Sequence, residues 1–122
     1  MMPPHLKNTD QRNIVSISFP LSDFSDFKRR PAIIISNNYY NSKQEDIVVM
    51  GITSQLEKQR EYVIPVSNAD MENGFLPFQS EIRCDKLLLV HKSKIVAFYG
   101  KLSKNKFIQT INQLNELVKE TV

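Results

Sequence analysis

Four successive apolar residues stand in the stretch Pro31-Ala32-Ile33-Ile34-Ile35-Ser36. A second apolar run, DIVVMGIT, follows at residues 46–53. Valine and isoleucine are typical of strands, and a strand that is apolar at consecutive positions is expected to be covered on both of its faces. The two runs therefore predict two buried strands and indicate a mainly β fold.

Shorter β-rich runs flank this pair, and polar segments separate them. We expect further strands at residues 14–19, 62–66, 80–90 and 94–102. The composition predicts loops or turns at residues 21–30, 37–44, 54–60 and 73–74. Pro65 places its strand at an edge or a bulge, because proline has no N–H to donate to a neighbouring strand.

The hydrophobic period changes near the C-terminal end. Ser103 is a suitable helix N-cap, and apolar residues then recur at helical spacing: Phe107, Ile111, Leu114 and Val118. This pattern predicts an amphipathic helix over residues 103–119, with Ile108 and Leu117 beside its apolar stripe. Short strands at close spacing followed by one helix predict a small barrel or curled sheet with the helix packed on it.

Length and composition indicate one small domain. The chain has 122 residues, 41% of them hydrophobic and 24% charged, as in an ordinary globular protein. We expect a flexible N-terminal arm at residues 1–12 and one folded domain at residues 13–122. Cys84 is the only cysteine, which excludes an intramolecular disulfide and a cysteine-built zinc site.

The chain also lacks sequence features of a membrane or secreted protein. It has no apolar run of about 18 residues and no signal peptide, so we expect a cytoplasmic protein that makes no membrane contact. The net charge of +3 suits an anionic partner, although many domains without one are as basic.

Three motifs follow one another along the chain. The first joins residues 14–20 (IVSISFP) to Lys28-Arg29-Arg30-Pro31, and the second is Gly51-Ile52-Thr53-Ser54-Gln55. The third is residues 80–86 (SEIRCDK), followed by Gly100-Lys101-Leu102-Ser103. Together they resemble the MazF/PemK family of toxin endoribonucleases over residues 13–118. The chain departs from the family at Arg12-Asn13, where Gly-Asp is usual, and in the loop at residues 23–27.

The resemblance implies a small SH3-like (Src-homology-3) barrel of the type found in MazF, CcdB and Kid toxins, and a homodimer. It also implies the toxin of a type II toxin–antitoxin system, which cleaves single-stranded mRNA without a metal ion or other cofactor. The ribose 2′-hydroxyl would attack, leaving a cyclic phosphate. A cognate antitoxin would block the RNA groove with an acidic segment, and any link to DNA would run through that antitoxin.

Such cleavage needs a group that stabilises negative charge on the phosphorane, and Arg30 is the first candidate. A guanidinium offers a fork of donors that fits two phosphate oxygens, and it keeps its charge. Thr53 is the second candidate, because it stands where a buried strand meets a polar loop and can donate to a phosphate oxygen. Alternatively, Arg30 is a solvated end of a basic run and Thr53 serves strand propensity alone. The sequence does not assign the general base and the general acid.

Residues near these two are candidates for binding RNA. They are Lys28 and Arg29 for the RNA backbone, Phe27 for stacking on a base, and Ser54, Gln55 and Arg83 for other contacts. Gln55 either reads a base edge or satisfies its own loop. Arg83 either contacts phosphate or pairs with Asp85 or Glu81. Phe24, in the same loop as Phe27, is expected to anchor that loop to the core.

Other chemistries find little support in the sequence. Neither His5 nor His91 has a second catalytic motif nearby, no metal-ligand spacing occurs, and Cys84 is expected to be a small buried apolar residue. Two rival functions stay open. One is a toxin that acts by binding alone, as a gyrase poison of the CcdB type does, and the other is a degenerate nuclease that only binds RNA or protein.

Overall fold

The computed structural model describes residues 9–20 and 27–121. Within them, seven strands form one antiparallel sheet in the order β4-β6-β3-β2-β1-β7-β5. The strands are β1 Asn13–Pro20, β2 Phe27–Ile34, β3 Asp46–Thr53, β4 Val63–Val66, β5 Met71–Gly74, β6 Ser80–His91 and β7 Ile95–Leu102. The helices are α2 Asn38–Lys43 and α3 Lys104–Val118, with 3₁₀ turns η1 Asn68–Asp70 and η2 Lys92–Lys94.

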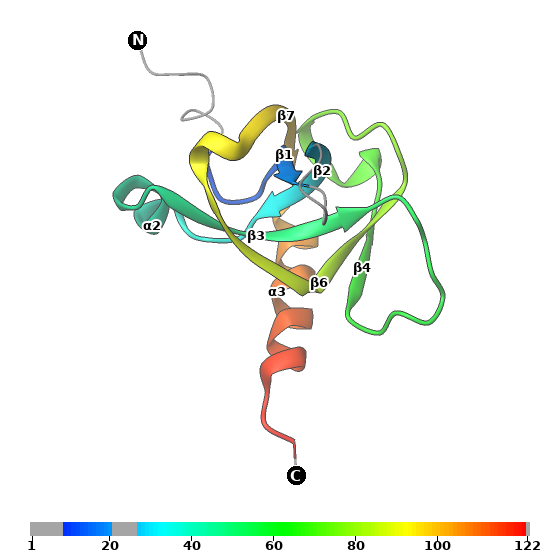
Figure 1. Ribbon diagram of the computed structural model, residues 1–122. Helices are drawn as coiled ribbons and strands as arrows, with labels where there is room; N and C mark the ends of the chain where they lie inside the picture. Colours follow the sequence, from blue (N-terminus) through cyan, green and yellow to red (C-terminus); the bar gives the residue numbers. More distant parts are fainter. Residues whose placement is uncertain (1–8, 21–26, 122) are drawn as a thin grey trace.

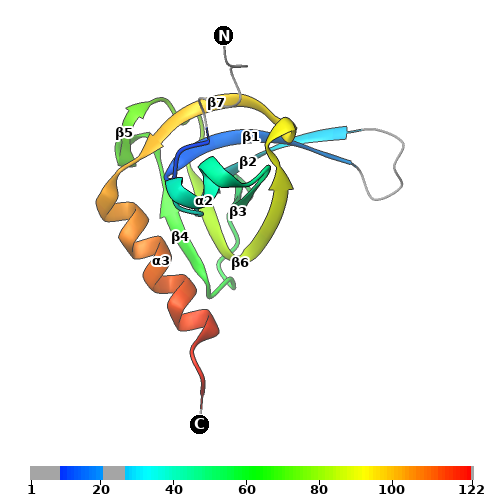
Figure 2. The same cartoon turned by 90° about the vertical axis from the view of Figure 1, so that its left-hand side faces the viewer.

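The sheet curls into a half-barrel with α3 packed against β4 and β6 (Figure 1). This confirms the predicted fold class, a mainly β barrel with a C-terminal helix. The ends of β1 and β2 project from the sheet on the side away from α3 (Figure 2). In both views the last turns of α3 extend beyond the sheet.

The central strands are buried on both faces, as their apolar runs predicted. On β2, Ile33 packs in one core cluster, while Ala32 and Ile34 pack in a second. On β3, Met50 belongs to the first cluster and Val49 to the second. Alternate residues of a strand point to opposite faces, so consecutive apolar residues are needed where both faces are covered.

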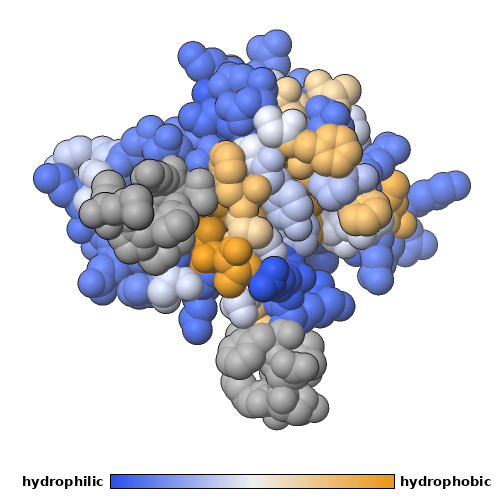
Figure 3. Space-filling model, turned by 90° about the horizontal axis from the view of Figure 1, so that it is seen from above, coloured by the Kyte–Doolittle hydropathy of each residue, from blue (hydrophilic) through white to orange (hydrophobic). Residues whose placement is uncertain are grey.

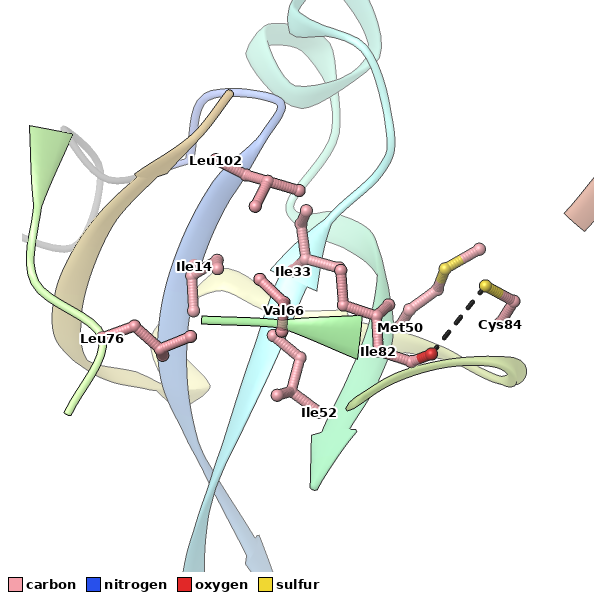
Figure 4. Packing of buried hydrophobic residues seen from close by; sticks show 9 residues of the cluster. All are labelled: Ile14, Ile33, Met50, Ile52, Val66, Leu76, Ile82, Cys84 and Leu102. Atoms are coloured by element: carbon pink, nitrogen blue, oxygen red, sulfur yellow. Dashed lines mark hydrogen bonds between the residues drawn. The ribbon is translucent and has the colours of Figure 1, made fainter. Parts of the chain in front are cut away.

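The first cluster lies between the sheet and α3. Its members come from six strands and the β5–β6 connection, and Figure 4 shows them pointing toward one another: Ile14, Ile33, Met50, Ile52, Val66, Leu76, Ile82, Cys84 and Leu102. Phe107 and Leu114 of α3 pack against this cluster, and Ser103 caps the helix by accepting a hydrogen bond from the N–H of Lys106. These two contacts account for the predicted helix and for its apolar stripe. Pro65 lies in β4, an outer strand of the sheet, as predicted.

Parts of three predicted loops are regular structure among the described residues. Residues 28–30 belong to β2, where Lys28 pairs with Phe19 and Arg30 with Ile17. These positions were predicted as loop because they are charged, but they lie on the exposed part of the β1–β2 ribbon, where polar side chains do not disturb backbone pairing.

Residues 38–43, predicted as a turn, form the short helix α2. The Asn37 side chain accepts from the N–H of Tyr40 at its N-terminus, and buried Asn41 donates to Thr9 O and Ser36 O at 2.6 and 2.9 Å. A helix this short shows no hydrophobic period, so its polar composition predicted a turn instead. Asn73-Gly74, also predicted as a turn, is the end of β5, and Gly74 pairs with Gly100 of β7.

Residues 1–8 of the predicted N-terminal arm lie outside the described residues, so the arm stays a prediction there. Residues 9–12 pack on the sheet. Thr9 is buried, and the N–H of Arg12 donates to Ile34 O at 2.9 Å. In the part of the chain that the structure describes, no helix has the length and apolar character needed to cross a membrane.

Candidate active site

A cleft opens beside the exposed end of β2. Its volume is about 250 Å³, and its lining comes from β2, the end of β3 and the loop after it, the β5–β6 connection, the start of β6, and β7. The residues on its walls are Lys28, Arg29, Arg30, Pro31, Ile52, Thr53, Ser54, Gln55, Leu76, Pro77, Phe78, Ser80 and Tyr99. The structure therefore brings together the Arg-Pro and Ile-Thr-Ser-Gln motifs, with Ser80 from the start of the third motif.

A second, smaller cleft of about 150 Å³ adjoins the first. Five residues line both clefts: Arg30, Pro31, Ile52, Thr53 and Gln55. Arg30 and Thr53 therefore stand at the boundary between the two clefts, on adjacent strands β2 and β3. The second cleft adds residues from β6 and the β3–β4 loop, namely Arg60, Arg83, Lys86 and Leu88, together with Phe19 and Gly51.

The hydroxyl of Thr53 is oriented by its own loop. Its Oγ1 accepts a hydrogen bond from the N–H of Gln55 at 3.1 Å, so the hydroxyl proton remains available to another acceptor. The side chain of Gln55 is exposed and makes no hydrogen bond to a described residue. The loop backbone is satisfied instead by Arg60, whose Nη1 donates to Gln55 O at 2.6 Å. Gln55 thus has a free amide that faces both clefts.

Arg60 fastens this loop to the sheet. Its guanidinium contacts Glu81 of β6 at 3.2 Å and Glu57 at 3.3 Å, and the side chains of Arg60 and Glu81 are only 15% and 13% exposed. A partly buried ion pair with additional hydrogen bonds holds geometry better than an exposed pair does. Arg60 therefore fixes the segment that carries Thr53 and Gln55.

An irregularity in β6 brings the third motif into the second cleft. Met50 pairs with Leu87 and Ile52 with Ile82, so Gly51 alone stands opposite residues 83–86. A bulge of this kind redirects side chains and is frequent beside active sites. Arg83 there pairs with Asp85 at 3.2 and 3.0 Å, which is one of the alternatives left open for it. This fork-to-carboxylate hydrogen bond lowers the pKa of Asp85 and raises that of Arg83.

Lys86 follows in the same bulge, and its aliphatic stem lies over Gly51. A Cβ added at Gly51 would meet Lys86 Cδ at 3.0 Å. Burial lowers the pKa of Lys86, and the nearby charge of Arg30 lowers it further. Lys86 and Arg60 were not among the residues predicted for the site. The Arg-Cys-Asp-Lys motif contained Lys86, but only the fold reveals that β6 bends to bring it beside Arg30.

The remaining candidates fall in or near the same place, with some exceptions. Lys28, Arg29 and Ser54 are exposed and line the first cleft. The backbone of Phe27 pairs with Pro20 in β2, but its side chain, like Phe24 as a whole, lies outside the described residues, so both roles stay predictions.

Two of the residues that the sequence argued against, His91 and Cys84, do not line the clefts. His91 caps η2 by accepting from the N–H of Ser93, and His5 lies outside the described residues. Cys84 is fully buried in the first core cluster, where burial raises the pKa of its thiol to about 11, so it is a packing residue as predicted. Over the described ranges, no three His, Cys, Asp or Glu side chains come close enough to hold a metal ion.

Solved structures share this fold. The chain has a TM-score of 0.76 and 15% identity to a MazE–MazF complex from Deinococcus radiodurans, covering 93% of this chain and 99% of that one. An endoribonuclease in complex with its cognate antitoxin, from a mycobacterial species, gives 0.74 and 13% with coverages of 93% and 97%. The Mycobacterium tuberculosis toxin MazF-mt6 gives 0.67 and 17% with coverages of 88% and 99%. At these identities the likeness establishes the fold alone.

The comparison with sequence families is more specific. No curated protein matches the chain. A family model does match, that of the PemK-like, MazF-like toxin of type II toxin–antitoxin systems, over residues 10–118. This span includes every described residue that lines the two clefts. The chain therefore belongs to the PemK-like, MazF-like toxin family.

Proposed function

We propose that this protein is the toxin of a type II toxin–antitoxin pair and an endoribonuclease that cleaves single-stranded mRNA. The observation that carries the proposal is the position of Arg30 and Thr53 on the boundary between two clefts. A strand of RNA that fills both clefts would pass its backbone across these two side chains. Family membership and the endoribonuclease relatives of the same fold support this substrate class.

The proposed reaction uses the RNA as its own nucleophile. The ribose 2′-oxygen attacks the adjacent phosphorus as it loses its proton, and the bond from phosphorus to the 5′-oxygen breaks as that oxygen gains a proton. The products are a 2′,3′-cyclic phosphate and a 5′-hydroxyl end. Arg30 stabilises the added negative charge, and the free hydroxyl proton of Thr53 donates to a phosphate oxygen. No step requires a metal ion.

Neighbouring groups are proposed to bind the RNA on either side. Lys28 and Arg29 contact its backbone, Ser54 and the free amide of Gln55 contact bases or sugars, and Phe78 offers an exposed ring, 68% accessible, for stacking. Arg83 lines the second cleft, where its guanidinium pairs with Asp85, so its part in RNA binding is secondary.

The partners follow from the same charges. We propose that an antitoxin inserts an acidic segment over Lys28, Arg29 and Arg30 and thereby competes with RNA. The toxin would be a homodimer that acts in the cytoplasm, where mRNA is available, and would meet DNA only through its antitoxin. Complexes of relatives with an antitoxin support the first of these proposals.

Substitutions at the boundary test the proposed function. Arg30→Ala and Thr53→Ala should each slow cleavage of a long RNA by at least tenfold, because removing one charge-stabilising donor commonly costs a factor of roughly 100 to 1,000. Lys104→Ala is the matched control, since Lys104 is exposed at the start of α3 and lines neither cleft. Cleavage is followed by gel electrophoresis, and circular dichroism checks that each variant is folded. Cleavage by folded Arg30→Ala at the wild-type rate would refute the assignment.

A further inference from the structure

The two clefts differ in the chemistry of their walls. The first cleft combines three cations, Lys28, Arg29 and Arg30, with an apolar and aromatic set: Leu76, Pro77, Phe78 and Tyr99. Four cationic side chains line the second: Arg30, Arg60, Arg83 and Lys86. Apolar and aromatic surfaces suit nucleobases, whereas cations suit phosphate groups. The second cleft is therefore shaped for a different part of a nucleotide than the first.

Two of the four cations are already neutralised. Arg60 pairs with Glu81 and Glu57, and Arg83 pairs with Asp85. Among the described residues, neither Arg30 nor Lys86 has an ion-pair partner. The uncompensated positive charge of the second cleft thus rests on these two residues, one on β2 and the other on β6.

The surroundings of Lys86 favour an anion. Its stem lies over Gly51, and with Arg30 it also borders a shallow apolar hollow formed by Phe19 and Leu88. Burial and the neighbouring guanidinium groups lower its pKa, which means that the ammonium form is less favoured here than in a solvated lysine. A phosphate placed between Lys86 and Arg30 would reverse that effect, because it adds the missing opposite charge.

We propose that the second cleft is a phosphate subsite, in which Lys86 binds the phosphate that neighbours the scissile one. The proposal rests on the proposed function for its substrate class. A single strand would place a base against the wall at Phe78, its scissile phosphate at Arg30 and Thr53, and the next phosphate at Lys86. Arg60 and Arg83 line the same cleft, but their ion pairs with Glu57, Glu81 and Asp85 leave the phosphate to Lys86 and Arg30.

The test measures binding without cleavage. A fluorescein-labelled, random-sequence 2′-O-methyl oligonucleotide cannot be cut, and its affinity is followed by fluorescence anisotropy as the salt concentration rises. Lys86→Gln keeps most of the stem over Gly51 and removes the charge. We expect about tenfold weaker binding. The slope of log affinity against log salt should become shallower by about 0.7, the value for one phosphate contact in a single strand.

Two further variants separate this role from general effects. Lys86→Arg should restore the slope, since it restores the charge. Lys104→Gln removes a lysine outside the clefts and should leave both slope and affinity close to those of the wild type. In RNA cleavage, Lys86→Gln should raise KM and leave kcat nearly unchanged, as expected for a group that binds substrate and transition state alike.

Several outcomes would overturn the subsite. An unchanged salt slope in folded Lys86→Gln is one, and a fall in kcat with KM and slope unchanged is another, because it would indicate proton transfer. Weakened binding of an acidic peptide with oligonucleotide binding intact would assign the cleft to a protein partner instead. The proposed function can fail while the subsite stands. That would be the result if Lys86→Gln made the salt slope of oligonucleotide binding shallower but the wild-type protein cut no RNA.

Discussion

Arg12 adopts a backbone conformation that few residues other than glycine tolerate. Its φ is 77°, in the left-handed region, and its backbone bridges two strands by donating to Ile34 O and accepting from the N–H of Leu102. The guanidinium donates to Leu102 O at 2.9 Å and to Glu72 at 3.2 Å. Glycine is usual at this position in the family motif, and glycine adopts a left-handed backbone without strain. Arginine strains the backbone here, but its side chain makes two contacts that glycine cannot make.

Two substitutions separate the strain from the contacts. Arg12→Gly and Arg12→Ala both remove the guanidinium, but only glycine relieves the left-handed backbone. We therefore expect Arg12→Gly to be more stable than Arg12→Ala by about 1 kcal/mol, opposite to the usual order of the two residues in a regular element. Urea denaturation measures the difference. An alanine variant as stable as the glycine variant would show that the position is not strained.

At this scale the sequence predicted Arg30 and Thr53 as site residues, and the structure places both on the walls of the two clefts. Arg30 and Thr53 were recognisable because each stands in a short motif next to an apolar strand. Arg60 and Lys86 were not, because their positions depend on tertiary structure: Arg60 reaches Glu81 from a polar loop, and Lys86 approaches Arg30 only through the bulge in β6. A residue whose role comes from a register shift leaves no local pattern in the sequence.

At the scale of elements, the strands were predicted where both faces are buried and missed where backbone pairing extends into solvent. The apolar residues of β3 gave its bounds, whereas residues 28–30 of β2 looked like a loop because they are charged. The end of β5 was missed for another reason. Gly74 and Gly100 approach so closely that neither can carry a side chain, and Asn73-Gly74 has the composition of a turn.

Alanine substitutions at Gly100 and at Gly51 test the importance of this contact between β5 and β7. An added Cβ at Gly100, where φ is 153°, would lie 2.2 Å from Asn73 O, so Gly100→Ala should lower the free energy of unfolding by roughly 2 kcal/mol or more. At Gly51 the Cβ would meet only the flexible stem of Lys86. Gly51→Ala should stay within about 0.5 kcal/mol of the wild type.

The two glycine variants should also differ in nucleic-acid binding. Gly51→Ala displaces Lys86 and is expected to weaken oligonucleotide binding although the protein remains stable. Gly100→Ala should affect stability first. If both variants lost the same stability in denaturant unfolding, the distinction between backbone and side-chain neighbours would be wrong.

At the scale of the whole molecule, ten large apolar residues are more than 40% exposed in the described part of the chain. Exposed apolar residues gather on the outer faces of β6 and β7 and on α3: Leu87, Leu89, Val96, Phe98, Ile108 and Val118. Figure 3 looks down on the side of β7 and shows apolar residues in the middle of the view. Exposed apolar surfaces commonly mark an interface, and a self-complementary one gives a twofold dimer.

We expect light scattering at micromolar concentration to give twice the mass of one chain. Phe98→Glu tests the strand face and Ile108→Glu tests the helix, and the variant on the true interface should give monomers because it buries an unpaired charge. Ser42→Glu, on the exposed surface of α2, serves as the control. A wild-type protein that remains monomeric over this range would contradict the proposed homodimer.

The central claim is that the clefts around Arg30 and Thr53 cut RNA by using its own 2′-hydroxyl. The most direct measurement maps the cut site in a long RNA with excess EDTA and then repeats the reaction on a short RNA spanning that site. In a second version of the short RNA, only the ribose on the 5′ side of the cut is 2′-deoxy. We expect the all-RNA strand to be cut in EDTA, leaving a cyclic phosphate or its hydrolysis product, and the deoxy strand to remain intact. Cleavage of the deoxy strand, or cleavage that stops in EDTA and returns with magnesium, would contradict the account.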